Sequence, residues 1–312
     1  MLHFILRRLL YLIPVWLGIS LVAFLLTNLT PGDPARLALQ RELGRQPTTE
    51  ETAAAQEQMG LNDAAPIRYL KWLSDAVTGD LGTSYRTGTP VLGSLAERFP
   101  NTLKIAGFGL LLAIAIAMPL GVLAAVYRRS PIDHFSRVIA LLGASMPSYW
   151  IAYLLILLLS VRLGLLPVAG SQTWQHAVMP ALTLGIGGSA SLMRLTRSET
   201  LETLNQDYIR TARAKGLRSG KVLIGHALRN TLIPLTTVLG MRFAGMLGGA
   251  VIVETIFSWP GIGKLMVDAI FDRDYPMIQG FVLFMGTAFL LINLLVDLGY
   301  GLIDPRIRLA RT

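Results

Sequence analysis

Long apolar runs dominate this sequence and restrict what it can fold into. Three of them, 9–29, 105–126 and 138–161, contain no charged residue, and a fourth, 276–303, contains only Asp297. A bilayer core about 30 Å thick is crossed by about 20 mostly apolar residues in a helix. Only 15% of the residues are charged, whereas a soluble chain carries about 25%. We therefore predict an integral membrane protein.

Two weaker runs bring the expected number of spans to six. The run 174–193 is diluted by three glycines, and the run 232–256 contains the charged residues Arg242 and Glu254. Inside a bilayer every backbone polar group needs a partner within the protein, so only helices and closed barrels can cross it. The predicted fold is an all-α integral membrane protein with six transmembrane helices.

Lysine and arginine are distributed unevenly between the connecting segments. With the N-terminus placed in the cytoplasm, the inner segments hold 16 of these residues among 66 positions, and the outer segments hold 11 among 109. Cytoplasmic loops carry an excess of positive charge, so both termini are predicted to be cytoplasmic. The inner segments are then 1–8, 127–137, 194–231 and 304–312.

The predicted organisation has three parts. The run 9–29 is longer than the 7–15 apolar residues of a signal peptide, so residues 1–29 are expected to form an N-terminal membrane anchor. Segment 30–95 has apolar positions too sparse for an independent core, which predicts a small extracytoplasmic cap. Residues 96–312 would form the membrane core and include the cytoplasmic loop 194–231.

A short helix is expected at the end of the extracytoplasmic segment. Val91, Leu92, Leu95 and Phe99 recur at helical spacing, which is typical of a helix lying in the membrane interface. Pro100 is expected to end this helix before the second span begins.

The sequence offers no catalyst, no metal site and no nucleotide site. A P-loop requires G-x-x-x-x-G-K-[ST], but the nearest stretch, 258–265, has Ser258 in place of the first glycine and Leu265 in place of the hydroxyl residue. The chain has no cysteine, which excludes disulfides, iron–sulfur clusters and thiolate metal sites. The net charge of +9 comes from short basic clusters separated by apolar runs, so no nucleic-acid partner is expected.

The loop 194–231 is far longer than a connector between two spans requires. Residues 198–215 are predicted to form a helix that Gly216 ends in a left-handed conformation. Ser219 can cap a second helix, 220–230, that leads into the fifth span. The predicted product is a helix–glycine–helix elbow joined to two spans, by which a partner could move this chain from outside.

The sequence of this elbow resembles the EAA loop of ABC importer permeases, in the variant found in the dipeptide/oligopeptide/nickel group. Aligned on Gly216, it matches the general pattern E-A-A-x₃-G-x₉-I-x-L-P at Ala212, Gly216 and Leu228. It departs from that pattern at Arg210, Thr211, His226 and Arg229, and these departures are typical of the peptide group. The stretches 98–103, 253–263, 273–276 and 304–308 also resemble the B-type subunit of such permeases.

The resemblance implies the membrane-spanning subunit of an ABC type I importer in the plasma (inner) membrane of a prokaryote. Such a subunit works with a homologous permease, two cytoplasmic ABC ATPases and an extracytoplasmic solute-binding protein, within membrane lipid. It implies no cofactor on this chain, since ATP and Mg²⁺ are used by the partner ATPases. The elbow would dock onto an ATPase through Arg210, Thr211, Ala212, Arg213, Ala214, Lys215, Gly216 and Leu217.

Three alternatives remain open at this stage. The basic residues of loop 194–231 could serve only to fix the topology. An ion-coupled secondary carrier would use an intramembrane acid such as Asp297, and its uptake would persist without ATP but fail with an uncoupler. A scaffold that transports nothing would show no uptake defect when deleted. The substrate itself cannot be named, because peptides, glutathione and nickel chelates all fit permeases of this kind.

Charged residues inside the spans are candidate pathway residues. Arg242 lies near the middle of its span, where a lipid-facing arginine costs about 2.5–3.5 kcal/mol. Asn293 lies at a similar depth, and Asp297 could be reached by bending, so these residues either lock the fifth and sixth spans together or line a polar pathway. Gly240, Ala244 and Gly248 form a stripe of small residues that favours close packing, against a partner or within this chain.

Glu254 is too far along the helix to pair with Arg242. With Trp259 and Gly261 it is predicted to lie at the outer rim, as a gate or a contact for the binding protein.

Overall fold

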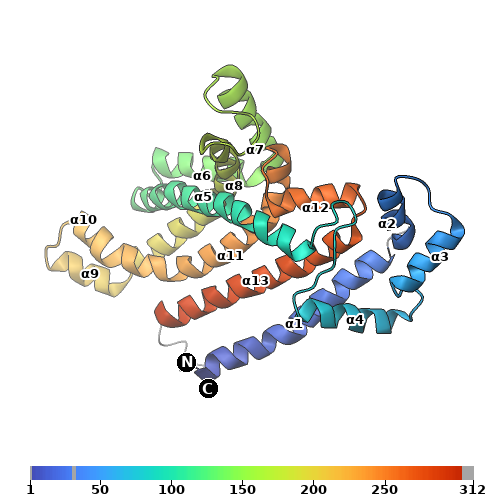
Figure 1. Ribbon diagram of the computed structural model, residues 1–312. Helices are drawn as coiled ribbons and strands as arrows, with labels where there is room; N and C mark the ends of the chain where they lie inside the picture. The colour runs from blue at the N-terminus through green and yellow to red at the C-terminus, as the bar shows by residue number, and fades with distance from the viewer. Residues whose placement is uncertain (1, 30–32, 304–312) are drawn as a thin grey trace. The chain divides into compact units, whose positions relative to one another are not determined.

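The computed structural model describes residues 2–29 and 33–303, without the side chains of residues 2–6, 29, 233, 237, 297 and 300–303. The fold class predicted from sequence is confirmed, because every named element in this part of the chain is helical (Figure 1). The elements are α1 (Leu2–Leu29), α2 (Pro34–Leu43), α3 (Thr49–Gln58), α4 (Ala65–Val77), α5 (Val91–Val126), α6 (Pro131–Ser145), α7 (Ser148–Leu155), η1 (Ile156–Arg162), α8 (Gln175–Leu204), α9 (Asp207–Ala214), α10 (Ser219–Val222), η2 (Leu223–Ala227), α11 (Leu228–Ile256), α12 (Ile262–Phe271) and α13 (Tyr275–Ile303).

Five helices in the described residues are long and apolar enough to cross a membrane, and they lie in α1, α5, α8, α11 and α13. The predicted third span, 138–161, is not one straight helix. It is divided between α6 and the run formed by α7 and η1, which meet at an angle of 105°. Pro147 explains the bend, because a proline disfavours helical backbone in the residue before it, and Met146 is extended at φ −84° and ψ 126°. The number of spans is six if this bent pair is counted as one.

The expected helix break at Pro100 is wrong. The apolar residues from Val91 onward and the second span belong to the single helix α5. The two polar residues after the proline do not cap a new helix, because Thr102 donates a hydrogen bond to Glu254 and Asn101 donates one to the Pro260 carbonyl. A second difference is α12, which lies in a stretch expected to be only a connector.

Contacts divide the chain into two compact units. One comprises Met1–Pro100 and Lys264–Leu291, and the other comprises Asn101–Gly263 and Ile292–Thr312. In the first unit α1 packs against the beginning of α13. Trp16 donates a hydrogen bond of 2.9 Å to Thr287, and Gly286 leaves room for the Ile19 side chain.

A buried carboxylate in the first unit organises the loop before α5. Asp274 accepts hydrogen bonds from the Ser84 hydroxyl and from the backbone N–H groups of Tyr85 and Arg86. These hydrogen bonds satisfy the carboxylate of Asp274, a residue that is 2% exposed. They also join the loop 83–87 to the start of α13.

The central helix of the second unit is α8, which packs against α6, α7 and α11. One apolar cluster combines Ile105, Ala152, Met179 and Val253 with their neighbours, and another combines Ala117, Ala140, Leu192 and Leu235. Two of the three glycines that weakened the apolar signal of this span, Gly185 and Gly188, lie at close contacts, as does Gly121 of α5. A Cβ on Gly185 would lie 3.0 Å from the Gly109 carbonyl oxygen of α5, and a Cβ on Gly121 would lie 2.7 Å from Thr196.

A buried ion pair also joins α6 to α8. Asp133 is 1% exposed and accepts two hydrogen bonds from the Arg197 guanidinium, at 2.8 and 2.9 Å. Its carboxylate also accepts the backbone N–H of Arg129 at 3.0 Å. The turn before α6 is therefore attached to the part of α8 that leads into loop 194–231.

We predict that Asp133→Asn lowers the free energy of unfolding by about 3 kcal/mol, because removing one partner leaves the Arg197 charge without its counterion in a largely buried site. Arg137→Gln is the matched control. Arg137 contacts the same carboxylate at 3.3 Å, but its side chain is 49% exposed, so its loss should cost less than about 1 kcal/mol. Thermal unfolding in detergent measures both, and equal effects would contradict the assignment.

Candidate functional site

A cavity of about 520 Å³ lies between α7, α8 and α11. It is lined by Ser148, Thr183, Leu184, Gly187, Gly188, Val238, Met241, Arg242, Gly245, Met246 and Gly249. Among the described residues that line it, Arg242 alone is charged, and it lies at the midpoint of α11. Small and apolar residues with one cation make this cavity suited to a solute that carries a negative group.

Of the two contacts expected for Arg242, only the one with Asn293 lies within the described residues, and it is not formed. Arg242 has no hydrogen bond or ion pair with the residues that the structure describes, and Asn293 interacts elsewhere. The side chain of Asp297 lies outside the described residues, so the expected pair with Arg242 stays a prediction. In the cavity, the residues around Arg242 that come from other helices lie on α7 and α8.

The small residues of α11 divide between two surroundings. Gly240 packs within the chain, because a Cβ there would lie 2.2 Å from the Val296 side chain of α13. Gly245, Gly248 and Gly249 have nothing within 4 Å of such a Cβ, and Gly245 and Gly249 line the cavity. Packing within the chain therefore accounts for Gly240 and for Ala244, which is buried, while Gly245, Gly248 and Gly249 are open.

The residues predicted to lie at the outer rim form a buried hydrogen-bonded cluster and not an exposed contact. Glu254 is 0% exposed and accepts a hydrogen bond of 2.6 Å from Thr102, whose oxygen also accepts the Ile262 N–H at 3.0 Å. Trp259 is 5% exposed and donates its indole N–H to the Asn101 carbonyl at 3.0 Å. The expectation that Glu254 touches a binding protein is corrected by this burial.

Gly261 is part of the same buried cluster. A Cβ on Gly261 would lie 2.1 Å from the Glu254 carboxylate, and a Cβ on Gly263 would lie 2.9 Å from it. The close approach of the carboxylate therefore requires glycine at Gly261, and the Val251 backbone, 2.6 Å from such a Cβ, requires it at Gly263. The cluster connects the end of α11 to α5.

The loop 194–231 forms an elbow at the ends of α8 and α11 (Figure 1). Gly216 has φ +78°, which confirms the predicted left-handed turn. The expected single helix 198–215 is wrong, because α8 ends at Leu204 and α9 begins at Asp207. Ser219 is also not the cap of the second helix, since Arg218 occupies that position without a side-chain hydrogen bond. From Ser219 the helix continues through η2 directly into α11.

The elbow has a small apolar core of its own. Ile209, Ala212, Val222 and Ala227 are buried together, with Leu217 packed against them. Ala212 is therefore directed inward, so any part it has in docking is to position its neighbours. The Tyr208 hydroxyl accepts a hydrogen bond of 2.8 Å from Asn230, which joins α9 to the start of α11.

The outer surface of the elbow is basic, with an apolar side chain among the charges. Arg210, Thr211, Arg213, Ala214, Lys215 and Gly216 are exposed, as are Arg218 and Lys221. Ile224 is 70% exposed. Sequence reasoning missed Ile224, although an isoleucine beside Lys221 in a basic loop was a signal that could have been used. It also missed Ser148 and Thr183 of the cavity, which only the packing of α7 and α8 against α11 brings near Arg242.

Comparison with known proteins gives a consistent set of similarities. The family model of the binding-protein-dependent transport system inner membrane component matches residues 117–309, and the model of the N-terminal part of such components matches residues 1–106. The glutathione transport system permease protein GsiC of Escherichia coli (strain K12) is 40% identical over 308 residues, which cover 99% of each chain. The oligopeptide transport system permease protein AppB of Bacillus subtilis (strain 168) is 41% identical over 315 residues, 97% of this chain and 98% of AppB.

A solved structure shares the fold. The MetNI methionine ABC transporter in inward-facing conformations aligns with 68% of this chain and 96% of its own, with a TM-score of 0.58 and 18% identity. None of these similarities supports the ion-coupled carrier or the scaffold.

We predict that Ala212→Asp destabilises the elbow by about 2–4 kcal/mol, because it places a carboxylate in an apolar core without a partner. Ala214→Asp introduces the same side chain on the same helix at an exposed position, and should change stability by no more than about 0.5 kcal/mol. The rate of tryptic cleavage after the arginines of α9 measures this local stability. Equal cleavage rates for the two variants would show that Ala212 is not packed as observed.

Proposed function

The chain belongs to the family of binding-protein-dependent transport system inner membrane components, and we propose that it forms half of the solute pathway of an ATP-driven importer. It is a multi-pass protein of the inner membrane and a transport subunit. The observation that carries the proposed pathway is the cavity between α7, α8 and α11, with Arg242 in its lining halfway along a membrane span.

Short peptides or related small solutes are the proposed cargo. The relatives GsiC and AppB are named for glutathione and oligopeptide transport. Glutathione and peptides with a free C-terminus carry a carboxylate. A guanidinium can bind a carboxylate through two parallel hydrogen bonds, so Arg242 is the residue we propose to hold one during passage.

A homologous permease is proposed as the partner that completes the pathway. The open glycines of α11 leave its backbone accessible beside the cavity, and small residues of this kind let two membrane helices approach closely. An extracytoplasmic binding protein would deliver the solute. Glu254, Trp259 and Gly261 are buried in this chain, so we propose that the binding protein contacts other residues.

The energy for transport is proposed to come from two cytoplasmic ABC ATPases, which would use ATP and Mg²⁺. Moving a two-state equilibrium from 1:99 to 99:1 needs about 5.5 kcal/mol of differential binding. The exposed basic surface of the elbow, with Ile224 within it, is the proposed docking site. Because the elbow continues without interruption into α11, a displacement of the elbow would reach the cavity through one helix.

We predict that Gly245→Leu lowers solute uptake at least about tenfold while the complex assembles normally. A leucine there has free space in the fold but projects beside a cavity that the solute must occupy. Gly240→Leu places the same side chain one turn away, against Val296, and should lower thermal stability instead. Uptake of labelled glutathione and di- to pentapeptides into proteoliposomes measures the effect. Normal uptake of the whole panel by Gly245→Leu would reject this cavity as the pathway.

We predict that Ile224→Asp abolishes the stimulation of ATP hydrolysis by the loaded binding protein. The exposed side chain can be changed without disturbing the core of the elbow, but an aspartate would oppose an apolar contact at a docking surface. Ile224→Leu is the conservative control and should retain stimulation. If Ile224→Asp is stimulated as strongly as the wild type, the docking surface lies elsewhere.

A further inference from the structure

The helix α4 is attached to the side of a membrane span. The Tyr69 hydroxyl lies 2.8 Å from the hydroxyl of Ser20, which is 0% exposed on α1. The Phe24 ring packs against Tyr69 with ring centroids 5.4 Å apart and against Trp72 with centroids 6.3 Å apart. These contacts lie within the first unit and fix α4 beside α1.

The position of these contacts along α1 gives the depth of α4. The span extends from Arg7 to Asn28, so Ser20 lies near its middle, whereas Phe24 lies four residues before its end, which is roughly 6 Å along a helix. A helix packed on Phe24 lies at the boundary between headgroups and acyl chains, and the Tyr69 side chain extends from this helix to Ser20. Tyrosine and tryptophan are enriched at this level.

The face of α4 turned away from α1 is apolar and uncovered. Ile67, Leu70 and Val77 are 50%, 62% and 69% exposed, and their spacing of three and seven residues places them on one stripe. An amphipathic helix with such a stripe buries it in the boundary between headgroups and acyl chains. Lipid is therefore the medium that fits this face.

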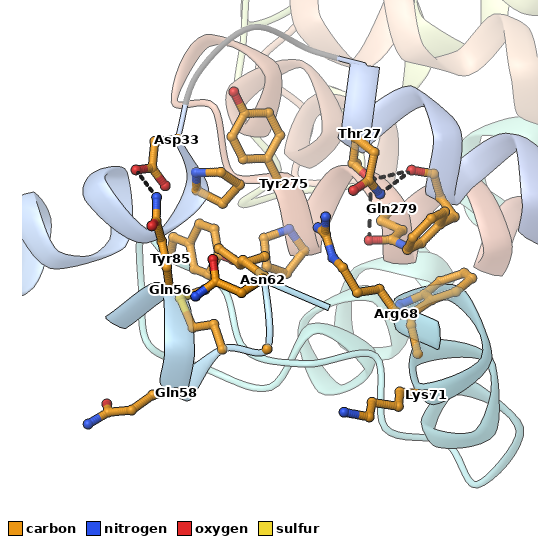
Figure 2. A pocket seen from close by; sticks show the side chains of 18 of the residues that line it. Thr27, Asp33, Gln56, Gln58, Asn62, Arg68, Lys71, Tyr85, Tyr275 and Gln279 are labelled. Atoms are coloured by element: carbon orange, nitrogen blue, oxygen red, sulfur yellow. Dashed lines mark hydrogen bonds between the residues drawn. The ribbon is translucent and has the colours of Figure 1, made fainter. Parts of the chain in front are cut away.

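The opposite side of α4 borders a pocket of about 740 Å³. Its wall also includes the end of α1 and the start of α13, and Figure 2 shows the Arg68 side chain extending from α4 into the middle of the pocket. Arg68 has no hydrogen bond or ion pair with the described residues. The Gln279 side-chain nitrogen is buried and also has no hydrogen-bond partner there. Two kinds of donor in this pocket therefore lack an acceptor.

The other charged groups of the pocket are engaged or lie at its rim. Asp33 caps α2 and accepts a hydrogen bond of 2.8 Å from Gln56, and Lys71 pairs with Asp63 at 2.6 Å. Burial, with the nearby Asp274 carboxylate as a second cause, raises the pKa of Tyr85 to about 12, so its phenol stays neutral. Asp75 is exposed and can receive an ammonium group. The interior is thus a site for an anion that accepts hydrogen bonds.

We propose that α4 lies in the membrane leaflet where α1 ends, and that the pocket holds the phosphate of a phospholipid from that leaflet. Arg68 and the Gln279 amide donate hydrogen bonds to the phosphate oxygens, and Asp75 suits the ammonium of an ethanolamine headgroup. Under the predicted topology this is the outer leaflet. The site would anchor the first unit in the bilayer, and it does not depend on the proposed solute pathway.

The depth of α4 can be measured directly because the chain has no cysteine. Single cysteines at Ile67, Leu70 and Val77 would carry spin labels in the complete complex, reconstituted into vesicles of phosphatidylethanolamine and phosphatidylglycerol. We expect higher accessibility to oxygen than to a water-soluble nickel chelate at all three positions. Ala54, exposed on α3, is the aqueous control and should show the reverse order. The same accessibility pattern on α4 as at Ala54 would overturn the placement.

The phosphate site is tested by retention of phospholipid. Arg68→Gln should lose the phospholipid that native mass spectrometry detects on the wild-type complex, with about tenfold weaker retention. Arg36→Gln removes an exposed arginine of α2 that bonds Gln46 and should retain it. Inorganic phosphate and a dipeptide, each added in excess, should leave the bound lipid in place. Displacement by either would assign the pocket to a soluble anion, and equal retention by the two variants would remove Arg68 from the site.

Discussion

Close packing around α8 is the constraint on which the second unit depends. Lipid tails are as apolar as leucine side chains, so helices in a bilayer associate through tight contact and not through the hydrophobic effect. The mutual approach of Gly109 and Gly185 supplies this contact between α5 and α8. Because α8 also borders the cavity and leads into the elbow, its placement determines both candidate functional regions.

Buried polar groups fasten the ends of these helices. Asp133 joins the start of α6 to α8 through Arg197, and Glu254 joins the end of α11 to α5 through Thr102. A buried carboxylate without a partner is costly, so each of these contacts tolerates little displacement. Each contact therefore fixes a helix that borders the cavity, α8 or α11, to a neighbouring helix.

Several features of the candidate site followed from local sequence. Gly216 was predicted to adopt a left-handed turn because glycine has no Cβ to clash there, and it does. The depth of Arg242 followed from counting residues along an apolar run. Its neighbours did not follow, because Ser148 and Thr183 lie on helices whose rotation about their own axes is decided by packing. For Glu254 the position at the end of a span was right, but its burial depends on Thr102 in a helix about 150 residues earlier.

The sequence by itself determined the membrane location, the helical fold and the family, because the length of an apolar run and a short motif are properties of neighbouring residues. Only the tertiary structure decided that a proline bends the third span by 105°, that Ala212 faces inward, and that the glycine-rich helix is the central one. It also placed α4 beside α1, through a hydrogen bond between residues 49 positions apart. The physical reason is the same in each case: the result depends on which faces of distant helices meet, and hydropathy along the chain does not specify that.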